Sequence, residues 1–124
     1  MADRDAPLDR DPNCLFCRIV AGEIPSTQVL ADEHVVVIRD IGPRAPTHVL
    51  VLPRRHIPSI REVGAGDVEL LGRIVAAANE VAREEGIAER GFRLVANVGE
   101  WGGQTVPHLH VHLLGGRAMS WPPG

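Results

Sequence analysis

Three histidines at alternate positions near the C-terminus restrict the fold of this chain more than any other feature. His108, His110 and His112 are separated by single aliphatic residues. Side chains of a β-strand point alternately to its two faces, so an extended segment here places all three imidazoles on one face. Imidazole can act as a nucleophile, an acid, a base or a metal ligand near neutral pH. We therefore predict a strand over residues 108–114 that carries the chemistry of the protein.

The remaining pattern predicts a small α+β domain. Apolar residues recur at spacings of three and four over residues 67–85, which is typical of a long amphipathic helix lying on a sheet. This apolar stripe consists of Val68, Leu71, Ile74, Val75, Ala78, Val81 and Ala82. A short N-terminal helix is expected over residues 14–20, with Asn13 as its cap. Runs typical of strands lie at residues 27–31, 35–39, 47–52 and 92–97. The nearly all-apolar run at 47–52 should be the central strand.

Length and composition indicate one domain. The chain has 124 residues with a hydrophobic content of 44%, which suits a single compact core. Residues 1–12 are rich in Asp and Arg and contain almost no apolar side chains, so we expect a flexible tail there. The domain itself is expected over residues 13–124.

Charge and hydropathy exclude several classes of partner. The net charge is -3, and no basic block or aromatic-basic stripe marks a nucleic-acid surface. No apolar run approaches the ~20 residues that cross a bilayer, and the first residues contain no hydrophobic signal core. We therefore expect a cytoplasmic protein that binds neither nucleic acid nor membrane. All 13 basic residues are arginine and tyrosine is absent, which excludes mechanisms based on a lysine Schiff base or a tyrosine acid.

Five further blocks accompany the alternating histidines in a fixed order along the chain. They are Asp40-Ile41, Ala45-Pro46-Thr47-His48, Asn97, Gly102-Gly103-Gln104-Thr105, and Gly115-Gly116-Arg117 with the ending Trp121-Pro122-Pro123-Gly124. Together with the histidine segment, these blocks make the chain from Cys14 onward resemble the Hint branch of the histidine triad (HIT) family. The resemblance implies a five-stranded antiparallel sheet with one long helix and a short N-terminal helix. It also implies a two-fold dimer in which two such sheets form one sheet of ten strands.

The resemblance further implies a hydrolase, a purine nucleoside phosphoramidase. Its substrates would be nucleoside 5′-phosphoramidates or related AMP conjugates, cleaved at the P–N bond to release AMP or GMP. His110 would be the nucleophile and form a covalent nucleotidyl-histidine that water hydrolyses. His108 and His112 would assist at the phosphate or the leaving group, and His48 would relay a proton with His112. Catalysis would require no cofactor.

Contacts to the nucleotide are implied by the same resemblance. Asp40 would accept the ribose hydroxyls, and Gln104 and Thr105 would donate to the phosphate or the leaving group. Three glycines in the loop over residues 98–106 let backbone amides approach an anion. The full set expected to contact the nucleotide is Phe16, Ile19, Ile38, Asp40, Ile41, Asn97, Gly103, Gln104 and Thr105.

Cys14 and Cys17 form a Cys-x-x-Cys pair that has three interpretations. A tetrahedral zinc site needs four ligands, and only histidines can complete it in this chain. The family resemblance supplies His56 and His108 as the other two ligands of such a structural site. A redox or disulfide pair and two plain packing thiols are the alternatives.

The histidine array also leaves alternative functions open. Spacing alone would suit a metal site as well. Within the resemblance, the alternatives are a dinucleoside-polyphosphate hydrolase of the Fhit-like branch and a non-enzymatic nucleotide-binding or scaffold protein. The Trp-Pro-Pro-Gly ending favours the phosphoramidase over the first alternative. Pro107 and Trp101 depart from the usual Hint pattern, and both bear on substrate preference.

Overall fold

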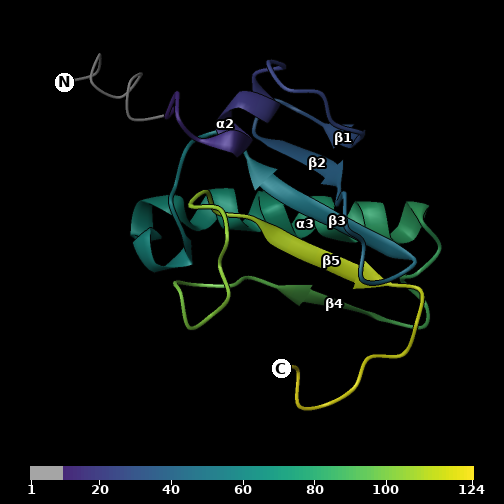
Figure 1. The fold of residues 1–124 in the computed structure, drawn as a ribbon. Helices are drawn as coiled ribbons and strands as arrows, with labels where there is room; N and C mark the ends of the chain where they lie inside the picture. Colours follow the sequence, from purple (N-terminus) through teal and green to yellow (C-terminus); the bar gives the residue numbers. More distant parts are fainter. Residues whose placement is uncertain (1–9) are drawn as a thin grey trace.

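The computed structural model describes residues 10–124, and its centre is a five-stranded antiparallel sheet with the order β1-β2-β3-β5-β4 (Figure 1). The strands are β1 (Gln28–Ala31), β2 (Val35–Arg39), β3 (Thr47–Pro53), β4 (Phe92–Val95) and β5 (Val111–Gly115). All residues of β3 are buried, and this strand lies in the middle of the sheet as predicted. The predicted five-stranded α+β fold is therefore confirmed.

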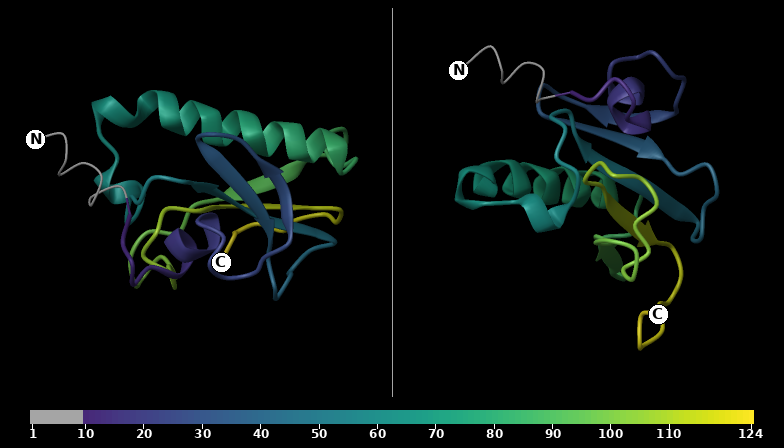
Figure 2. Two further views of the ribbon diagram at one scale, coloured as in Figure 1. Left: turned by 90° about the horizontal axis from the view of Figure 1, so that it is seen from above. Right: turned by 60° about the vertical axis from the view of Figure 1, so that its left-hand side comes forward.

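Within residues 10–124, the α-helices α2 and α3 cover opposite faces of the sheet (Figure 2). α3 (Val68–Glu84) lies over one face, where Ile74 and Val81 belong to the main hydrophobic core, and α2 (Leu15–Val20) lies on the other. Two members of the predicted stripe, Val68 and Val75, are 66% and 47% exposed. At 100° per residue they lie roughly 90–110° around the helix from the centre of the buried stripe, so they miss the sheet. The buried face of α3 is therefore narrower than the apolar stripe that the residue spacing predicts.

α2 has a different cap from the one predicted. Cys14, not Asn13, is the N-cap residue, and its Sγ accepts the backbone N–H of Cys17 at 3.3 Å. Asn13 instead donates its own backbone N–H to Oδ1 of Asp11. Because Cys14 begins the helix and Cys17 lies one turn later, both thiols are held in the interior, with exposures of 4% and 1%.

β5 begins at Val111, three residues after the predicted start at His108. Its ladder with β3 ends at the pair formed by Val51 and Val111. The ladder stops near Pro53, which has no N–H to donate and whose carbonyl oxygen accepts Nε2–H of His108 at 2.9 Å. The alternation nevertheless persists: Leu109 belongs to the core under α3, while the ring of His108 contacts the α2 side.

The two ends of the chain leave the sheet. The predicted tail over residues 1–12 falls mainly on residues 1–9, which lie outside the described residues, so the boundary of a domain at 13–124 stays a prediction. The segment after β5 extends beyond β4 (Figure 1), and Trp121 within it is 82% exposed. Between residues 10 and 124, no helix combines the length and apolarity that crossing a membrane requires.

Candidate functional site

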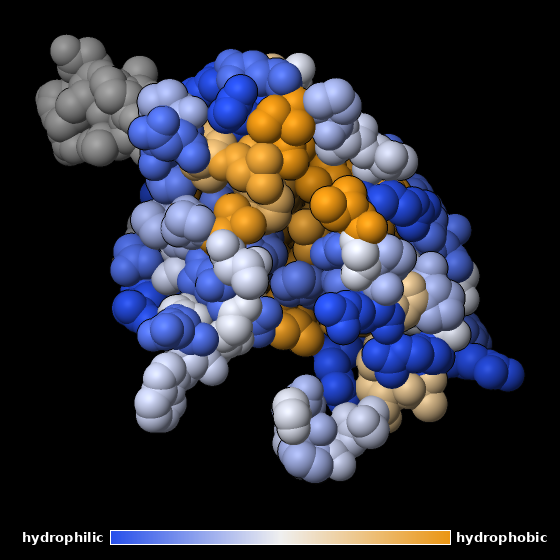
Figure 3. All heavy atoms as spheres, in the orientation of Figure 1, coloured by the Kyte–Doolittle hydropathy of each residue, from blue (hydrophilic) through white to orange (hydrophobic). Residues whose placement is uncertain are grey.

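A cleft of about 650 Å³ opens on the α2 face of the sheet. Figure 3 shows this face, where an apolar region is hollowed at its centre and bordered by hydrophilic side chains. The volume lies in the range of small-molecule sites. The cleft is lined by Leu15, Phe16, Ile19, Pro25, Ser26, Thr27, Ile38, Arg39, Asp40, Ile41, Leu50, Thr105, Val106, His110 and His112.

Most of the predicted site residues meet at this cleft, although they come from distant parts of the chain. Those that line it are Phe16, Ile19, Ile38, Asp40, Ile41, Thr105, His110 and His112. Seven lining residues were not predicted, because no motif distinguishes them from ordinary core or loop positions: Leu15, Pro25, Ser26, Thr27, Arg39, Leu50 and Val106. Five predicted residues do not line the cleft, namely His48, Asn97, Gly103, Gln104 and His108.

The tautomer of His110 is set by the main chain. Its Nδ1–H donates to the carbonyl oxygen of His108 at 2.7 Å. A carbonyl can only accept, so the proton lies on Nδ1 and the lone pair lies on Nε2. The ring is 6% exposed and meets Phe16 edge-on, with ring centroids 5.1 Å apart. In its neutral form, His110 therefore presents an unprotonated Nε2 at a site that is largely shielded from water.

A second main-chain contact fixes the orientation of the His48–His112 pair. The backbone N–H of Arg44 donates to Nδ1 of His48 at 3.0 Å, which leaves the proton of neutral His48 on Nε2. That Nε2 lies 2.9 Å from Nδ1 of His112 and donates to it. The proton of neutral His112 is consequently on Nε2. Oδ2 of Asp40 lies 3.5 Å from Nε2 of His48 and completes a polar group beside the cleft.

Burial keeps these rings neutral. It lowers the pKa of His112 to about 4, with smaller contributions from the nearby rings of His110 and His48. Burial also lowers the pKa of His48, although the Asp40 carboxylate opposes that effect. Near pH 7 the neutral His112 ring therefore offers a hydrogen-bond donor to the cleft.

Gln104 has a different role from the predicted one. Its Nε2 donates to the carbonyl oxygens of Pro58 and Val106, at 2.7 and 3.0 Å. Its Oε1 accepts the backbone N–H of Gly99 at 3.1 Å. The carboxamide thus holds the loop over residues 98–106 in place and has no free hydrogen for a phosphate.

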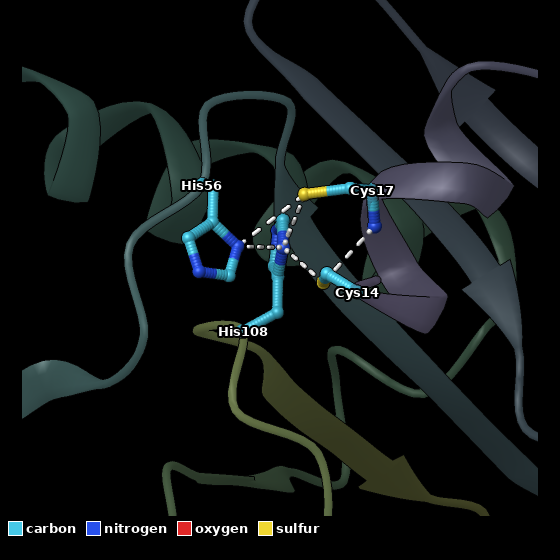
Figure 4. Close-up of side chains that lie close together, drawn as sticks. All are labelled: Cys14, Cys17, His56 and His108. Carbon is cyan, nitrogen blue, oxygen red and sulfur yellow. Dashed lines mark hydrogen bonds between the residues drawn. The ribbon is translucent and has the colours of Figure 1, made fainter. Parts of the chain in front are cut away.

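His108 is expected both beside the phosphate and as a metal ligand; it lies beneath the cleft, where it meets the other expected ligands. Its ring is fully buried, with Nε2–H donated to the carbonyl oxygen of Pro53. The opposite nitrogen, Nδ1, faces Cys14 and Cys17 at 3.3 and 3.5 Å (Figure 4). His56 completes the group, with its Nδ1 3.3 Å from Sγ of Cys17 and 3.3 Å from Nδ1 of His108.

These four side chains fit a tetrahedral zinc ion. Zn–S bonds of about 2.3 Å and Zn–N bonds of about 2.0–2.1 Å place two nitrogens about 3.3 Å apart, and sulfur about 3.5 Å from nitrogen. The four ligand atoms match this spacing and lie within 4.8 Å of one another. The contact from His108 to Pro53 resembles the outer hydrogen bonds that orient metal-binding imidazoles. Burial raises the pKa of Cys17 to about 11, so a metal ion must displace a thiol proton on binding.

Comparisons with known proteins show what this chain is similar to. The model of the family described as HIT domain matches residues 21–119. The chain is 47% identical to the purine nucleoside phosphoramidase of Escherichia coli K12 over 105 residues. This segment covers 85% of this chain and 88% of the relative. The chain is 44% identical over 127 residues to the 14 kDa zinc-binding protein of Zea mays, and this match covers 99% of this chain and 98% of the relative. The crystal structure of a HIT family hydrolase from Legionella pneumophila is 54% identical, with a TM-score of 0.89 over 90% of this chain and 100% of that one.

Proposed function

The chain belongs to the HIT family, and from this premise we propose that it is a nucleotidyl hydrolase that cleaves the P–N bond of purine nucleoside 5′-phosphoramidates or related AMP conjugates. The observation that carries the proposal is the hydrogen bond from Nδ1 of His110 to the carbonyl oxygen of His108. It frees Nε2 of His110 as a nucleophile within the cleft.

In the proposed reaction, Nε2 of His110 attacks the phosphorus in line with the leaving group. The new N–P bond forms as the bond from phosphorus to the amine breaks, and the amine leaves with the electron pair and a proton. The His110 ring becomes positively charged, so its hydrogen bond to the His108 carbonyl strengthens as the charge develops. Water then attacks the same phosphorus and gives a proton back to His112, the bond from phosphorus to Nε2 of His110 breaks, and the nucleoside monophosphate is released.

His112 is the proposed source of the proton for the amine. Its Nε2–H is directed away from His48, whose own proton occupies the other side of the ring. A bound phosphate is negative and favours the charged form of a nearby imidazole, so it raises the pKa of His112 above its value of about 4. The charged ring carries hydrogens on both nitrogens, so His48 must release its hydrogen bond to Nδ1 of His112 before Nε2 of His112 passes its proton to the leaving group.

The cleft also offers contacts for the nucleotide. Phe16, Ile19 and Ile38 form an apolar wall suited to the flat face of a base. Asp40 lies at the end of β2, and its Oδ1 already accepts the backbone N–H of Gly42 at 2.7 Å. This bond orients the carboxylate, whose remaining lone pairs can accept ribose hydroxyls. Thr105 supplies a hydroxyl for the phosphate.

Zinc is proposed as a structural ion held by Cys14, Cys17, His56 and His108. Four protein ligands leave no open position for a substrate, so the ion would stabilise the fold and would not act on phosphorus.

We also propose a two-fold dimer. β4 is an edge strand of the sheet. Leu94 in β4 is 37% exposed, and Val75 in α3 is 47% exposed. Pairing two β4 edges would give one sheet of ten strands, cover the β4 edge of each subunit and leave β1 at the two outer edges. Light scattering should give twice the chain mass, and a monomer at micromolar concentration would rule this pairing out.

The activity is tested by incubating the protein with adenosine 5′-phosphoramidate and measuring AMP release. His110→Ala should lower kcat/KM by on the order of 10⁴-fold or more, as loss of an enzyme nucleophile does. His34→Ala, a matched change in the β1–β2 connection, should leave the rate unchanged. Mass spectrometry after an alkaline quench should detect nucleotide on the peptide that contains His110. An unaltered rate in His110→Ala would reject this residue as the nucleophile.

Two further results would replace the proposed function. Faster turnover of diadenosine tetraphosphate than of the phosphoramidate would identify a dinucleoside-polyphosphate hydrolase. AMP binding without turnover of either compound would identify a nucleotide-binding protein that is not an enzyme.

A further inference from the structure

His108 connects the Cys/His cluster to the nucleophile through two different parts of the same residue. Its ring nitrogen Nδ1 faces Cys14 and Cys17 at 3.3 and 3.5 Å. Its backbone carbonyl accepts Nδ1–H of His110 at 2.7 Å. The ring is also held from its other side by the carbonyl of Pro53. Because the residue is fully buried and closely packed, a displacement of the His108 ring is transmitted to its backbone carbonyl, the atom that orients His110.

α2 makes a second connection between the two centres. Cys14 and Cys17 lie on the interior side of this helix, and Phe16 between them lines the cleft. The ring of Phe16 meets the rings of both His108 and His110 edge-on, with centroids 6.0 and 5.1 Å apart. Figure 4 shows the cysteines reaching from α2 toward His108 and His56, which come from other segments of the chain. The cluster thus attaches the wall of the cleft to the segment that carries the nucleophile.

We propose that a metal ion in the Cys/His cluster and a nucleotide in the cleft strengthen each other's binding through His108 and Phe16. The inference rests on the proposed function, because it takes the cleft to be a nucleotide site. It makes His108 a positioning residue, which acts through the His110 ring and does not touch the substrate.

The physical reason lies in how the cluster is held with and without metal. Without metal, contacts between the sulfurs and ring nitrogens are weak hydrogen bonds. Bonds to a zinc ion are much stronger and fix the four side chains in one arrangement. A bound metal ion restricts the range of positions that α2 and His108 can adopt. The nucleotide then loses less conformational entropy when it binds, because part of the site is already ordered. Linkage then requires the nucleotide to raise metal affinity by the same factor.

The test measures AMP binding by calorimetry with zinc-loaded and chelator-treated wild-type protein. A zinc buffer holds the free ion at a low concentration, so that AMP does not compete for it. We expect AMP to bind about five-fold or more tightly when zinc is present. In the reciprocal titration, saturating AMP should raise zinc affinity by an equal factor. His56→Ala removes one ligand that does not line the cleft, so at the same free zinc its AMP affinity should equal that of metal-free wild type.

A spectroscopic measurement reports on His110 directly. Nitrogen NMR of the imidazoles distinguishes a ring with its proton fixed on Nδ1 from a ring that exchanges between tautomers. We expect a single Nδ1–H form for His110 in the zinc-loaded protein and exchange between both forms in the metal-free protein. A purely structural ion would raise the melting temperature without changing this signal.

Several results would overturn the inference. Equal AMP affinity in both metal states would leave the proposed function intact and remove the coupling. A metal-free chain that is unfolded by circular dichroism, or a chain that binds no zinc, would also remove it. Absence of AMP binding in both states would instead reject the nucleotide cleft, and the proposed function with it. The wild-type comparison does not depend on whether His56→Ala folds.

Discussion

Replacing His112 by glutamine tests whether the histidine pair carries stability that is lost in acid. The folded chain holds the pKa of His112 at about 4, whereas an unfolded histidine has a pKa of about 6.5. Between these values the unfolded chain binds more protons than the folded chain. The contribution of His112 to the free energy of unfolding should therefore be complete above about pH 6.5 and should be lost as pH drops toward 4.

The size of the effect follows from the two pKa values. Linkage gives a loss of about 2 kcal/mol at about pH 5 relative to neutral pH for this one residue. Because the ring borders the cleft and solvent screens part of its interaction, we expect about 1 kcal/mol. In His112→Gln, the side-chain oxygen can still accept Nε2–H of His48, so the substitution removes the titrating group and keeps an acceptor.

The assay is urea unfolding at about pH 7.5 and about pH 5, with a chelator present so that metal binding does not vary. The loss of stability between the two conditions should be about 1 kcal/mol smaller in His112→Gln than in wild type. His34→Gln serves as the matched control and should behave as wild type. If His112→Gln and wild type lose the same stability in acid, the buried neutral state assigned to His112 is wrong.

Three other substitutions test the packing around the site. Ile74→Ala, at a core position that is 1% exposed, should lower the free energy of unfolding by about 2–5 kcal/mol in urea, and a smaller loss would mean that the core refills the cavity. Gly102→Ala places a Cβ against the backbone carbonyl of Val98, so the loop must shift and kcat/KM should fall by on the order of 10–100-fold, whereas Gly64→Ala has open space and should be neutral. Glu85→Gln removes the charge that pairs with Arg39 of β2, whose two guanidinium nitrogens each lie 2.9 Å from a carboxylate oxygen. It should lower the free energy of unfolding by about 0.5–1 kcal/mol, a difference that high salt should reduce.

The sequence predicts the fold well because its periodic signals are strong. The run at 47–52 is apolar enough to require burial on both faces, and it becomes the central strand β3. Burial along the apolar stripe of α3 is predicted correctly at its centre, for Ile74, Ala78 and Val81. The prediction is wrong at the edge of the stripe. A rim position such as Val75 depends on how the helix is rolled on the sheet, which spacing alone does not determine.

The site is harder to predict because residue type does not specify a hydrogen-bond partner. Gln104 has the donors that a phosphate needs, but the carbonyls of Pro58 and Val106 take them in the folded chain. His108 belongs to the alternating motif, yet both of its ring nitrogens are engaged below the cleft. These contacts join positions about 50 and 90 residues apart in sequence, so only the tertiary structure reveals them.

The partners that set the imidazole tautomers are main-chain atoms: the amide of Arg44 and the carbonyls of Pro53 and His108. Such atoms survive most point mutations. Any residue except proline at position 44 keeps the amide that donates to His48. Any residue at position 53 that keeps the path of the chain keeps the carbonyl that accepts from His108. Such substitutions do not change which imidazole nitrogen is protonated. Insertion or deletion of one residue beside Arg44, or at the end of β3 where Pro53 lies, would misalign these atoms, so chain length at these two places should drift far less among descendants of this chain than composition.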